Sequence, residues 1–392
     1  MSNKTNDRLD YIKSIVDDNI ICNIIDTCKV ENSPKKNFDI RKLMPKKILS
    51  MEKVITKLGG QLQYVKSGAS GHTFKGIYND DSKRKNYAVK VVAYPKKDRY
   101  GNIYDVSRPE NAELLTIQLL SQFVKKTNEN RYPQTPHIVL PITTFYTDIK
   151  TFVNLDKDDI VNNKKYKEFK KKYKNGEYYN KVSILISEWA NEGDLLDYIR
   201  KNYKSMDLKF WTVILFQIIS VLAIIQAKYP GFRHNDLKGN NILLQRIEPS
   251  KKYFLYKIND QHYLLPNIGF QIKLWDFDFA CIPGIVENKK VNADWTTKIN
   301  IKPIKNRYYD IHYFMNTLQS KGFFNEFYEK GAVPEKIKSF FNRIVPDKYR
   351  KGKYVSERGR ILTNDEYIIP DEILLKDPLF KKYKKNLDEL DI

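Results

Sequence analysis

The sequence contains few of the residues that build disulfide frameworks or zinc sites. Its 392 residues include three cysteines, Cys22, Cys28 and Cys281, and five histidines, and no two cysteines form a C-x-x-C pair. Structural zinc sites and disulfide frameworks both need closely spaced sets of such residues. We therefore expect neither, and the composition fits a reducing compartment.

Targeting and membrane signals are also missing. The first residues, MSNKTNDRLD, lack the basic and then apolar order of a signal peptide. No apolar run is expected to reach the roughly 20 residues that span a bilayer. The sequence thus predicts a soluble, intracellular protein without a transmembrane segment.

Acidic residues are in the minority. There are 47 Asp and Glu against 69 Lys and Arg, which gives a formal net charge of +22. This excess favours acidic partners, which include nucleotides, nucleic acid, anionic membranes and acidic protein segments. An A+T-rich genome would also explain the abundance of Asn, Ile, Lys and Tyr, so we predict no specific nucleic acid. The hydrophobic content of 41% is enough for a core and excludes global disorder.

Three regions are predicted along the chain. Residues 1–54 form a helical extension, because LDYIKSIVDDNIICNIIDTC has apolar residues at helical spacing. Residues 55–189 are rich in short strand-like runs, such as NYAVKVVAY and KVSILISEWA, with one helix in ENAELLTIQLLSQFV. A highly charged insertion near 147–181 is expected to be a solvated hairpin or helix, or alternatively a docking patch.

Residues 190–392 are predominantly helical. FWTVILFQIISVLAIIQAKY is apolar almost all round and predicts a buried helix. Two strand-like runs, YFLYKIN and FQIKLWDF, flank the turn signal LLPNIG, and RYYDIHYFMNTL and the basic tail are helical. The predicted fold class is α+β, with a strand-rich first lobe and a helical second lobe.

Two stretches of the first lobe suit phosphate groups. KSGASGHTFKG places Gly68 and Gly71 between strands, where backbone N–H groups can approach phosphate oxygens, although a plain hairpin turn looks the same. Lys90 lies in the apolar strand YAVKVV and needs an anion there, unless it snorkels from an edge. Glu113 is the expected ion-pair partner, because helical spacing turns it toward the sheet, and Glu110 is the reserve.

The stretch FRHNDLKGNN of the second lobe lies between a buried helix and the apolar strand NILL. Such a loop can aim Asp236 at a substrate hydroxyl and the amide oxygen of Asn241 at a metal, with Lys238 neutralising a transferring phosphoryl group. The alternative is a capped surface turn. Asp276 ends the strand LWDF and suits Mg²⁺, which prefers oxygen ligands. Asp278 is expected to be a helix or turn cap, with a second metal ligand and a solvated residue as alternatives.

The order of these features resembles the protein-kinase signature set over residues 60–320: glycine turn, strand lysine, helix glutamate, D-x-x-x-x-N loop and D-F strand end. WDFDFACIPGIVENKKV followed by NRYYDIHYFMNTL resembles the late serine/threonine kinase family of poxviruses and related large DNA viruses. The family implies a two-lobed kinase fold, ATP and Mg²⁺ as cofactors, and protein substrates. It also implies a role in virion assembly and a location in the host cytoplasm or the virion.

The resemblance further implies a role for each candidate residue. Asp236 corresponds to the catalytic base and Lys238 to its charge-neutralising neighbour. Asn241 and Asp276 correspond to the magnesium ligands, and Asp310 to a buried aspartate that braces the catalytic loop. The resemblance also implies a set of ATP contacts. Gly68 and Gly71 correspond to the glycine loop over the phosphates, Lys90 and Glu113 to the phosphate-binding lysine and its partner, Glu188 and Ala190 to the adenine-binding hinge, and Asp194 to the residue that contacts the ribose.

Three departures from the kinase pattern stand out. Asn235 replaces the arginine of H-R-D, which usually contacts a phosphorylated activation loop. Asp278 replaces the glycine of D-F-G, and no A-P-E follows. The distance from Asn241 to Asp276 is long for a kinase, and we expect an extra hairpin to fill it.

Two alternative functions remain. Small-molecule kinases of the choline and aminoglycoside type also use H-N-D or H-G-D loops and lack the D-F-G glycine, but Lys238 is typical of protein serine/threonine kinases. A catalytically inactive scaffold that binds through its basic surface is the second alternative. The retained Lys90, Asp236, Asn241 and Asp276 argue against it.

Overall fold

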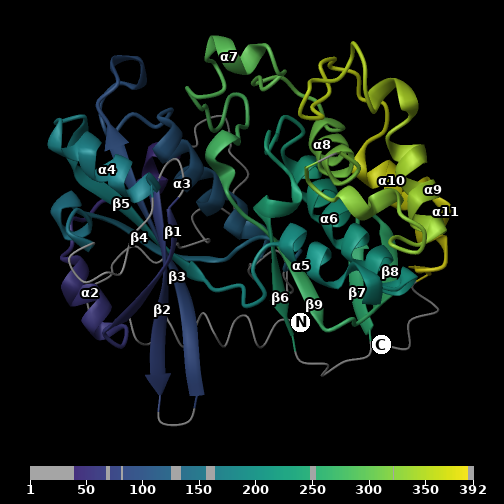
Figure 1. The fold of residues 1–392 in the computed structure, drawn as a ribbon, viewed down its shortest axis with the longest axis horizontal. Helices are drawn as coiled ribbons and strands as arrows, with labels where there is room; N and C mark the ends of the chain where they lie inside the picture. Colours follow the sequence, from purple (N-terminus) through teal and green to yellow (C-terminus); the bar gives the residue numbers. More distant parts are fainter. Residues whose placement is uncertain are drawn as a thin grey trace. The chain divides into compact units, whose positions relative to one another are not determined.

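The structure is a computed structural model, and it describes residues 39–67, 71–80, 83–124, 134–155, 164–247, 253–320 and 322–386. The predicted N-terminal helix and Gly68 lie outside the described residues. The chain divides into two compact units (Figure 1). The first takes its described residues from Met1–Tyr132 and Val139–Trp189, and the second from Pro133–Ile138 and Ala190–Ile392.

The first unit is built on a five-stranded antiparallel sheet with the order β1-β2-β3-β5-β4 (Figure 1). Its strands are β1 (Gln61–Ser67), β2 (Gly71–Asp80), β3 (Lys83–Pro95), β4 (Pro141–Asp148) and β5 (Tyr178–Glu188). The last seven residues of β5, VSILISE, are all buried, and four of them are the aliphatic residues Val182, Ile184, Leu185 and Ile186. The strand-rich composition predicted for this part of the chain is confirmed.

Three α-helices are described in the first unit, which are α2 (Met51–Lys57), α3 (Pro109–Leu120) and α4 (Lys164–Lys174). Every residue of α3 is buried. Of the two structures expected for the charged insertion near 147–181, the helix is found, because α4 lies within it between a 3-10 helix (Ile149–Phe152) and the start of β5. Tyr166 and Phe169 of α4 pack edge-on against His72 of β2, with ring centroids 5.5 and 4.6 Å away. The aromatic face of α4 is therefore anchored, while most of its lysines are exposed.

The helices of the second unit are α5 (Leu195–Asn202), α6 (Leu208–Lys228), α7 (Asp294–Thr297), α8 (Tyr309–Leu318), α9 (Glu335–Ile344), α10 (Pro370–Lys376) and α11 (Pro378–Lys381). Among the described helices, α6 alone is long and apolar enough to cross a membrane by length and composition. The expectation that no apolar run reaches this length was therefore wrong. The most apolar window of α6 is 83% buried inside the structure, which agrees with the predicted core helix.

Two small antiparallel sheets complete the second unit. Strand β6 (Ile242–Arg246) pairs with β9 (Phe270–Leu274), and β7 (Tyr253–Ile258) pairs with β8 (Gln261–Pro266), which also pairs with the short β10 (Lys384–Lys385). The hairpin of β7 and β8 fills the long gap before Asp276, as expected.

The position of the hairpin turn was predicted wrongly. The chain reverses after β7 at Asn259, which has a left-handed φ of 51°, and not at LLPNIG. Asn tolerates this conformation better than most residues, which makes a tight turn accessible there. The residues Leu264–Pro266 continue β8 instead, with Leu265 fully buried.

Three buried histidines make the stability of this fold depend on pH. Burial lowers the pKa of His72 to about 4, of His137 to about 3 and of His312 to about 4. Since their ordinary pKa is about 6.5, the unfolded chain binds protons more readily, and stability present above pH 6.5 is lost as the pH falls toward 4. The cost at pH 5 is about 2 kcal/mol per histidine.

We therefore expect a clearly lower urea midpoint at pH 5 than at pH 7. The imidazole of His312 contacts the Tyr349 carbonyl at 2.6 Å, which a glutamine amide can also donate to. The variant His312→Gln should show a shallower fall of the midpoint with decreasing pH. Equal slopes for the variant and the unaltered chain would contradict the assignment of His312.

Candidate active site

The loop between α6 and β6 is held in place by hydrogen bonds from its backbone to Asp310. This carboxylate at the start of α8 is fully buried and accepts hydrogen bonds from the backbone N–H of His234 (2.7 Å) and Asn235 (2.9 Å). Burial raises the pKa of Asp310, although His234 and its backbone N–H act in the opposite direction. The structure thus forms the brace that the kinase resemblance implied.

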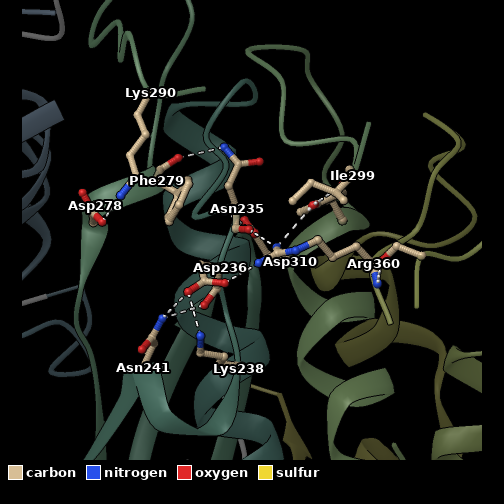
Figure 2. A network of polar contacts seen from close by, with 12 residues as sticks. Asn235, Asp236, Lys238, Asn241, Asp278, Phe279, Lys290, Ile299, Asp310 and Arg360 are labelled. Atoms are coloured by element: carbon tan, nitrogen blue, oxygen red, sulfur yellow. Dashed lines mark hydrogen bonds and ion pairs between the residues drawn. The ribbon is translucent and has the colours of Figure 1, made fainter. Parts of the chain in front are cut away.

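Asp236 is held through both oxygens of its carboxylate (Figure 2). Its Oδ2 accepts hydrogen bonds from Lys238 Nζ and from Asn241 Nδ2, each at 3.0 Å. Its Oδ1 accepts one from the guanidinium of Arg360. The loop therefore brings Asp236, Lys238 and Asn241 together in one polar network, as their spacing suggested.

The two candidate metal ligands stand at the ends of paired strands. Asn241 directly precedes β6 and Asp276 follows β9, and the backbone N–H of Trp275 donates to the Asn241 carbonyl at 3.2 Å. The Asn241 amide nitrogen donates to Asp236, so its amide oxygen is the atom suited to a cation. Carboxylate and amide oxygens fit Mg²⁺.

Among the residues that the structure describes, no three His, Cys, Asp or Glu side chains lie close enough to hold a metal ion.

Asp278 does not cap a helix, contrary to the expectation. It forms an ion pair with Lys290, whose ammonium also lies 3.9 Å from the ring centroid of Phe279. The chain after β9 folds back on itself, which brings Lys290 beside Asp278. Asn288 is fully buried and stabilises this reversal of the chain. Its amide donates hydrogen bonds of 3.0 Å to the carbonyls of Asp278 and Ala280.

Asn235 connects the loop around Asp236 to this same segment. Its amide donates to the Phe279 carbonyl at 2.9 Å and contacts Cys281 Sγ at 3.5 Å. A backbone bridge runs beside it, in which Arg233 and Cys281 exchange both N–H···O bonds at 3.0 and 3.1 Å. The residue that replaces the H-R-D arginine therefore contacts the D-F-D segment directly.

The first unit contains the strand lysine and its predicted partner. Lys90 on β3 and Glu113 on α3 form a buried ion pair. The reserve candidate, Glu110, pairs instead with Arg108 at 3.1 Å. Lys90 is opposite Thr73 of β2 and Leu185 of β5, so it is on an inner strand and not at a sheet edge.

Gly71 is needed for strand packing. The sequence alone did not show whether this glycine serves packing or phosphate binding. A Cβ at this position would lie 1.9 Å from the Val91 carbonyl oxygen. The close pairing of β2 with β3 therefore requires glycine here, whatever else the turn contacts. Its predicted partner Gly68 lies outside the described residues.

The candidate adenine and ribose residues are each anchored. Glu188 at the end of β5 forms two hydrogen bonds with Leu140. Its backbone N–H donates to the Leu140 carbonyl at 3.0 Å, and its carboxylate accepts from the Leu140 N–H at 2.9 Å. Ala190 follows two residues later and is buried. Asp194 caps α5 by accepting from the backbone N–H of Asp197 at 2.9 Å. Their nucleotide contacts stay predictions.

Comparison with known proteins identifies the family. A model of the poxvirus serine/threonine protein kinase family matches residues 86–351. The chain belongs to this family. The match covers both the Lys90 pair and the loop around Asp236, so the resemblance read from WDFDFACIPGIVENKKV is confirmed.

Viral kinases are among the relatives of this poxvirus-type kinase chain. A putative serine/threonine-protein kinase of Acanthamoeba polyphaga mimivirus is 51% identical over 354 residues, which are 88% of this chain and 74% of the relative. Serine/threonine-protein kinase 2 of fowlpox virus is 29% identical over 60% of this chain and 49% of its own length. The protein of the same name from vaccinia virus is 38% identical over 22% of this chain and 18% of its own length.

One member of the kinase site was missed by sequence reasoning. Arg360 is buried, donates to the Asn235 carbonyl and to Asp236 Oδ1, and stacks on Tyr313 with its guanidinium carbon 3.9 Å from the ring centroid. Burial alone would lower the pKa of Arg360, but Tyr309, Tyr313 and Asp236 outweigh it and raise the pKa. Arg360 follows Asp236 by 124 residues, in the stretch SERGRIL, which matches no kinase motif.

Proposed function

We propose that this protein transfers the γ-phosphoryl group of ATP to serine or threonine hydroxyls of protein substrates. The observation that carries the proposal is the loop geometry. Asp236 is fixed through both carboxylate oxygens, and Asp310 holds the backbone on which it sits. Membership of a serine/threonine kinase family supports the same reaction.

In the proposed reaction Asp236 orients the substrate hydroxyl and accepts its proton. Lys238, whose ammonium lies 3.0 Å from Asp236 Oδ2, offsets negative charge on the phosphoryl group in transfer. Because phosphoryl transfer depends mainly on positioning and electrostatic stabilisation, a rigid, charged loop suits it. The lysine separates this proposal from a small-molecule kinase.

The other candidate residues are proposed to bind the cofactors. Asn241 and Asp276 would hold Mg²⁺, which offsets phosphate charge when bound, and Lys90 would bind the α- and β-phosphates with Glu113 fixing its position. Contacts to the phosphates, adenine and ribose are proposed for Gly68, Gly71, Glu188, Ala190 and Asp194. Residues 55–189 and 190–392 would then be the two kinase lobes, with 1–54 as an extension.

A role in virion assembly, in the host cytoplasm or in the virion, is proposed by analogy with the poxvirus family alone. The net charge of +22 supports acidic segments as substrate features. Casein, which is acidic, and a basic protein therefore form an informative pair of test substrates.

The deciding experiment is transfer of label from γ-labelled ATP with Mg²⁺ to casein, a basic protein, choline and aminoglycosides. The variant Asp236→Asn should lower transfer to serine and threonine by about 10²-fold, because it removes the proton acceptor but keeps the side-chain shape. Asp207→Asn is the matched control, since Asp207 caps α6 in the same unit and asparagine caps equally well.

Each outcome discriminates between functions. The protein-kinase function is supported if label appears on serine or threonine of protein, if Asp236→Asn loses this transfer, and if Asp207→Asn keeps it. Label on choline or aminoglycosides alone would assign the protein to the small-molecule kinases. ATP binding without any transfer would favour the inactive scaffold.

A further inference from the structure

We propose that Arg360 is a positioning residue for phosphoryl transfer, which fixes the carboxylate of Asp236 and the peptide before it from a separate part of the chain. The inference rests on the proposed function, because it assigns a role to a residue that contacts the candidate base. Arg360 stands far downstream of the loop and outside the kinase signature residues.

The contacts of Arg360 are shared between the backbone and the side chain of the loop. One guanidinium nitrogen, Nη1, donates to the Asn235 carbonyl, and the other, Nη2, donates to Asp236 Oδ1 (Figure 2). A planar guanidinium can make both contacts at once, which a lysine ammonium cannot reproduce with the same geometry. Arg360 therefore fixes the orientation of the Asp236 carboxylate relative to its own backbone.

The peptide that Arg360 contacts has an uncommon conformation. Asn235 has a φ of 63°, in the left-handed region. Its N–H donates to Asp310 and its carbonyl accepts from Arg360. Two charged side chains thus hold this residue at both of its backbone groups, and the residue after it is Asp236.

Helix α8 supports the arrangement with two tyrosines one turn apart. Arg360 stacks on Tyr313 at 3.9 Å, and Arg233 stacks on Tyr309 at 3.7 Å. Asp310 lies between these tyrosines in sequence. Stacking on an aromatic face and burial restrict the guanidinium to one position.

The backbone around Arg360 is equally fixed. Val355 and Ile361 form an antiparallel bridge, and Ser356 and Arg360 are joined by hydrogen bonds of 2.8 and 3.0 Å. The carbonyls of Gly359 and Ile361, on either side of Arg360, accept from Asn316 and Asn300, each at 3.0 Å. The arginine is therefore presented by an anchored hairpin.

This anchoring favours positioning over inhibition. An inhibitory residue must leave when substrate binds, whereas the hairpin backbone and the Tyr313 stack hold Arg360 in place. Its bond to Oδ1 leaves acceptor capacity on the carboxylate, because the two oxygens together have about four lone-pair sites. A substrate hydroxyl can therefore still donate to Asp236.

The test compares Arg360→Gln and Arg360→Lys with the unaltered kinase. We expect Arg360→Gln to lower kcat by about 10- to 100-fold, as misplacement of a reacting group does. Nucleotide affinity and KM for ATP should change less than about twofold. Arg360→Lys should recover part of kcat, because it restores charge but not the paired contacts.

The control is Arg343→Gln. Arg343 of α9 forms an ion pair with Asp377 in the same unit through two hydrogen bonds of 2.8 Å each, and neither bond involves the loop around Asp236. Its loss should lower the melting temperature while leaving kcat nearly unchanged. An equal loss of kcat in this control would show that Arg360 acts through general stability only.

A double-mutant cycle with Asp236→Asn separates this inference from the proposed function. If Arg360 acts through Asp236, then Arg360→Gln should have little further effect on kcat in the Asp236→Asn background. Full additivity, or higher activity in Arg360→Gln, overturns the inference while the kinase assignment stands. Should Arg360→Gln fail to fold, Arg360→Lys is tested in the same cycle with the same criteria.

Discussion

The variant Lys90→Met is expected to lose phosphoryl transfer by roughly 10³-fold, because preorganised positive charge beside the phosphates is among the largest contributions to this chemistry. Methionine keeps much of the lysine volume but removes the charge. The measurement is the initial rate of label transfer to casein at saturating ATP. The loss should exceed that of Asp236→Asn, since a kinase relies more on charge stabilisation than on its base.

A stability control is needed, because Lys90 and Glu113 are both buried. Removing one partner of a buried ion pair costs about 3–5 kcal/mol, while replacing both by apolar residues is often neutral. We therefore expect Lys90→Met to lower the melting temperature, and Lys90→Met combined with Glu113→Leu to restore it. Neither variant should regain transfer.

Lys181→Met supplies the matched substitution on the same sheet. Lys181 of β5 is half-buried, with its ammonium 2.8 Å from the Tyr104 hydroxyl. The initial rate of label transfer by Lys181→Met should stay within about a factor of five of that of the unaltered protein, as expected for the loss of one polar contact of the ammonium. Transfer by the stable double variant at the normal rate would remove Lys90 from the mechanism.

Local sequence patterns predicted most elements of this fold. Apolar runs marked β3, β5 and α6, and the spacing of Asp236, Lys238 and Asn241 predicted their common loop. Periodicity and short motifs are decided within about 10–20 residues, which is the range in which sequence reasoning is strongest. The same holds for Glu113, whose place on α3 follows from helical spacing.

Features that depend on how the chain folds back on itself were not predictable in this way. Arg360 reaches Asp236 only because the hairpin of Val355 and Ile361 packs beside α8 through Asn316. Asp278 finds Lys290 because the chain folds back after β9. Arg360 is 124 residues from Asp236. Lys290 is only 12 residues from Asp278, but neither a periodic pattern nor a short motif indicates that the chain folds back between them.

The wrong turn in the β7–β8 hairpin has a local cause. Pro266 and Gly269 in LLPNIG are strong turn formers, and they outweighed Asn259, which makes the turn in the structure. Burial of Leu265 and pairing with β7 carry the chain through Pro266 at the end of β8. Tertiary packing here overrode the stronger local signal.

Asp276→Asn is expected to reduce transfer by roughly 10³-fold, because it replaces a charged metal ligand by a neutral one. Asp278→Asn is a matched control two residues away, since Asp278 pairs with Lys290 and is assigned no part in metal binding. Because the pair is largely buried, Asp278→Asn should lower the free energy of unfolding by more than the roughly 1 kcal/mol of a surface pair. Its rate of transfer should nevertheless fall far less than that of Asp276→Asn.

The Mg²⁺ dependence of these two variants distinguishes the roles of the acids. If Asp276 binds the metal, the Asp276→Asn variant should need much higher Mg²⁺ concentrations for its residual rate, and Asp278→Asn should keep the normal requirement. A shifted requirement in Asp278→Asn alone would exchange the two assignments. Because Asp276 follows β9 and Asn241 precedes β6, both ligands depend on the pairing of these strands. The proposed metal site would therefore be fixed by the same sheet that ends the loop around Asp236.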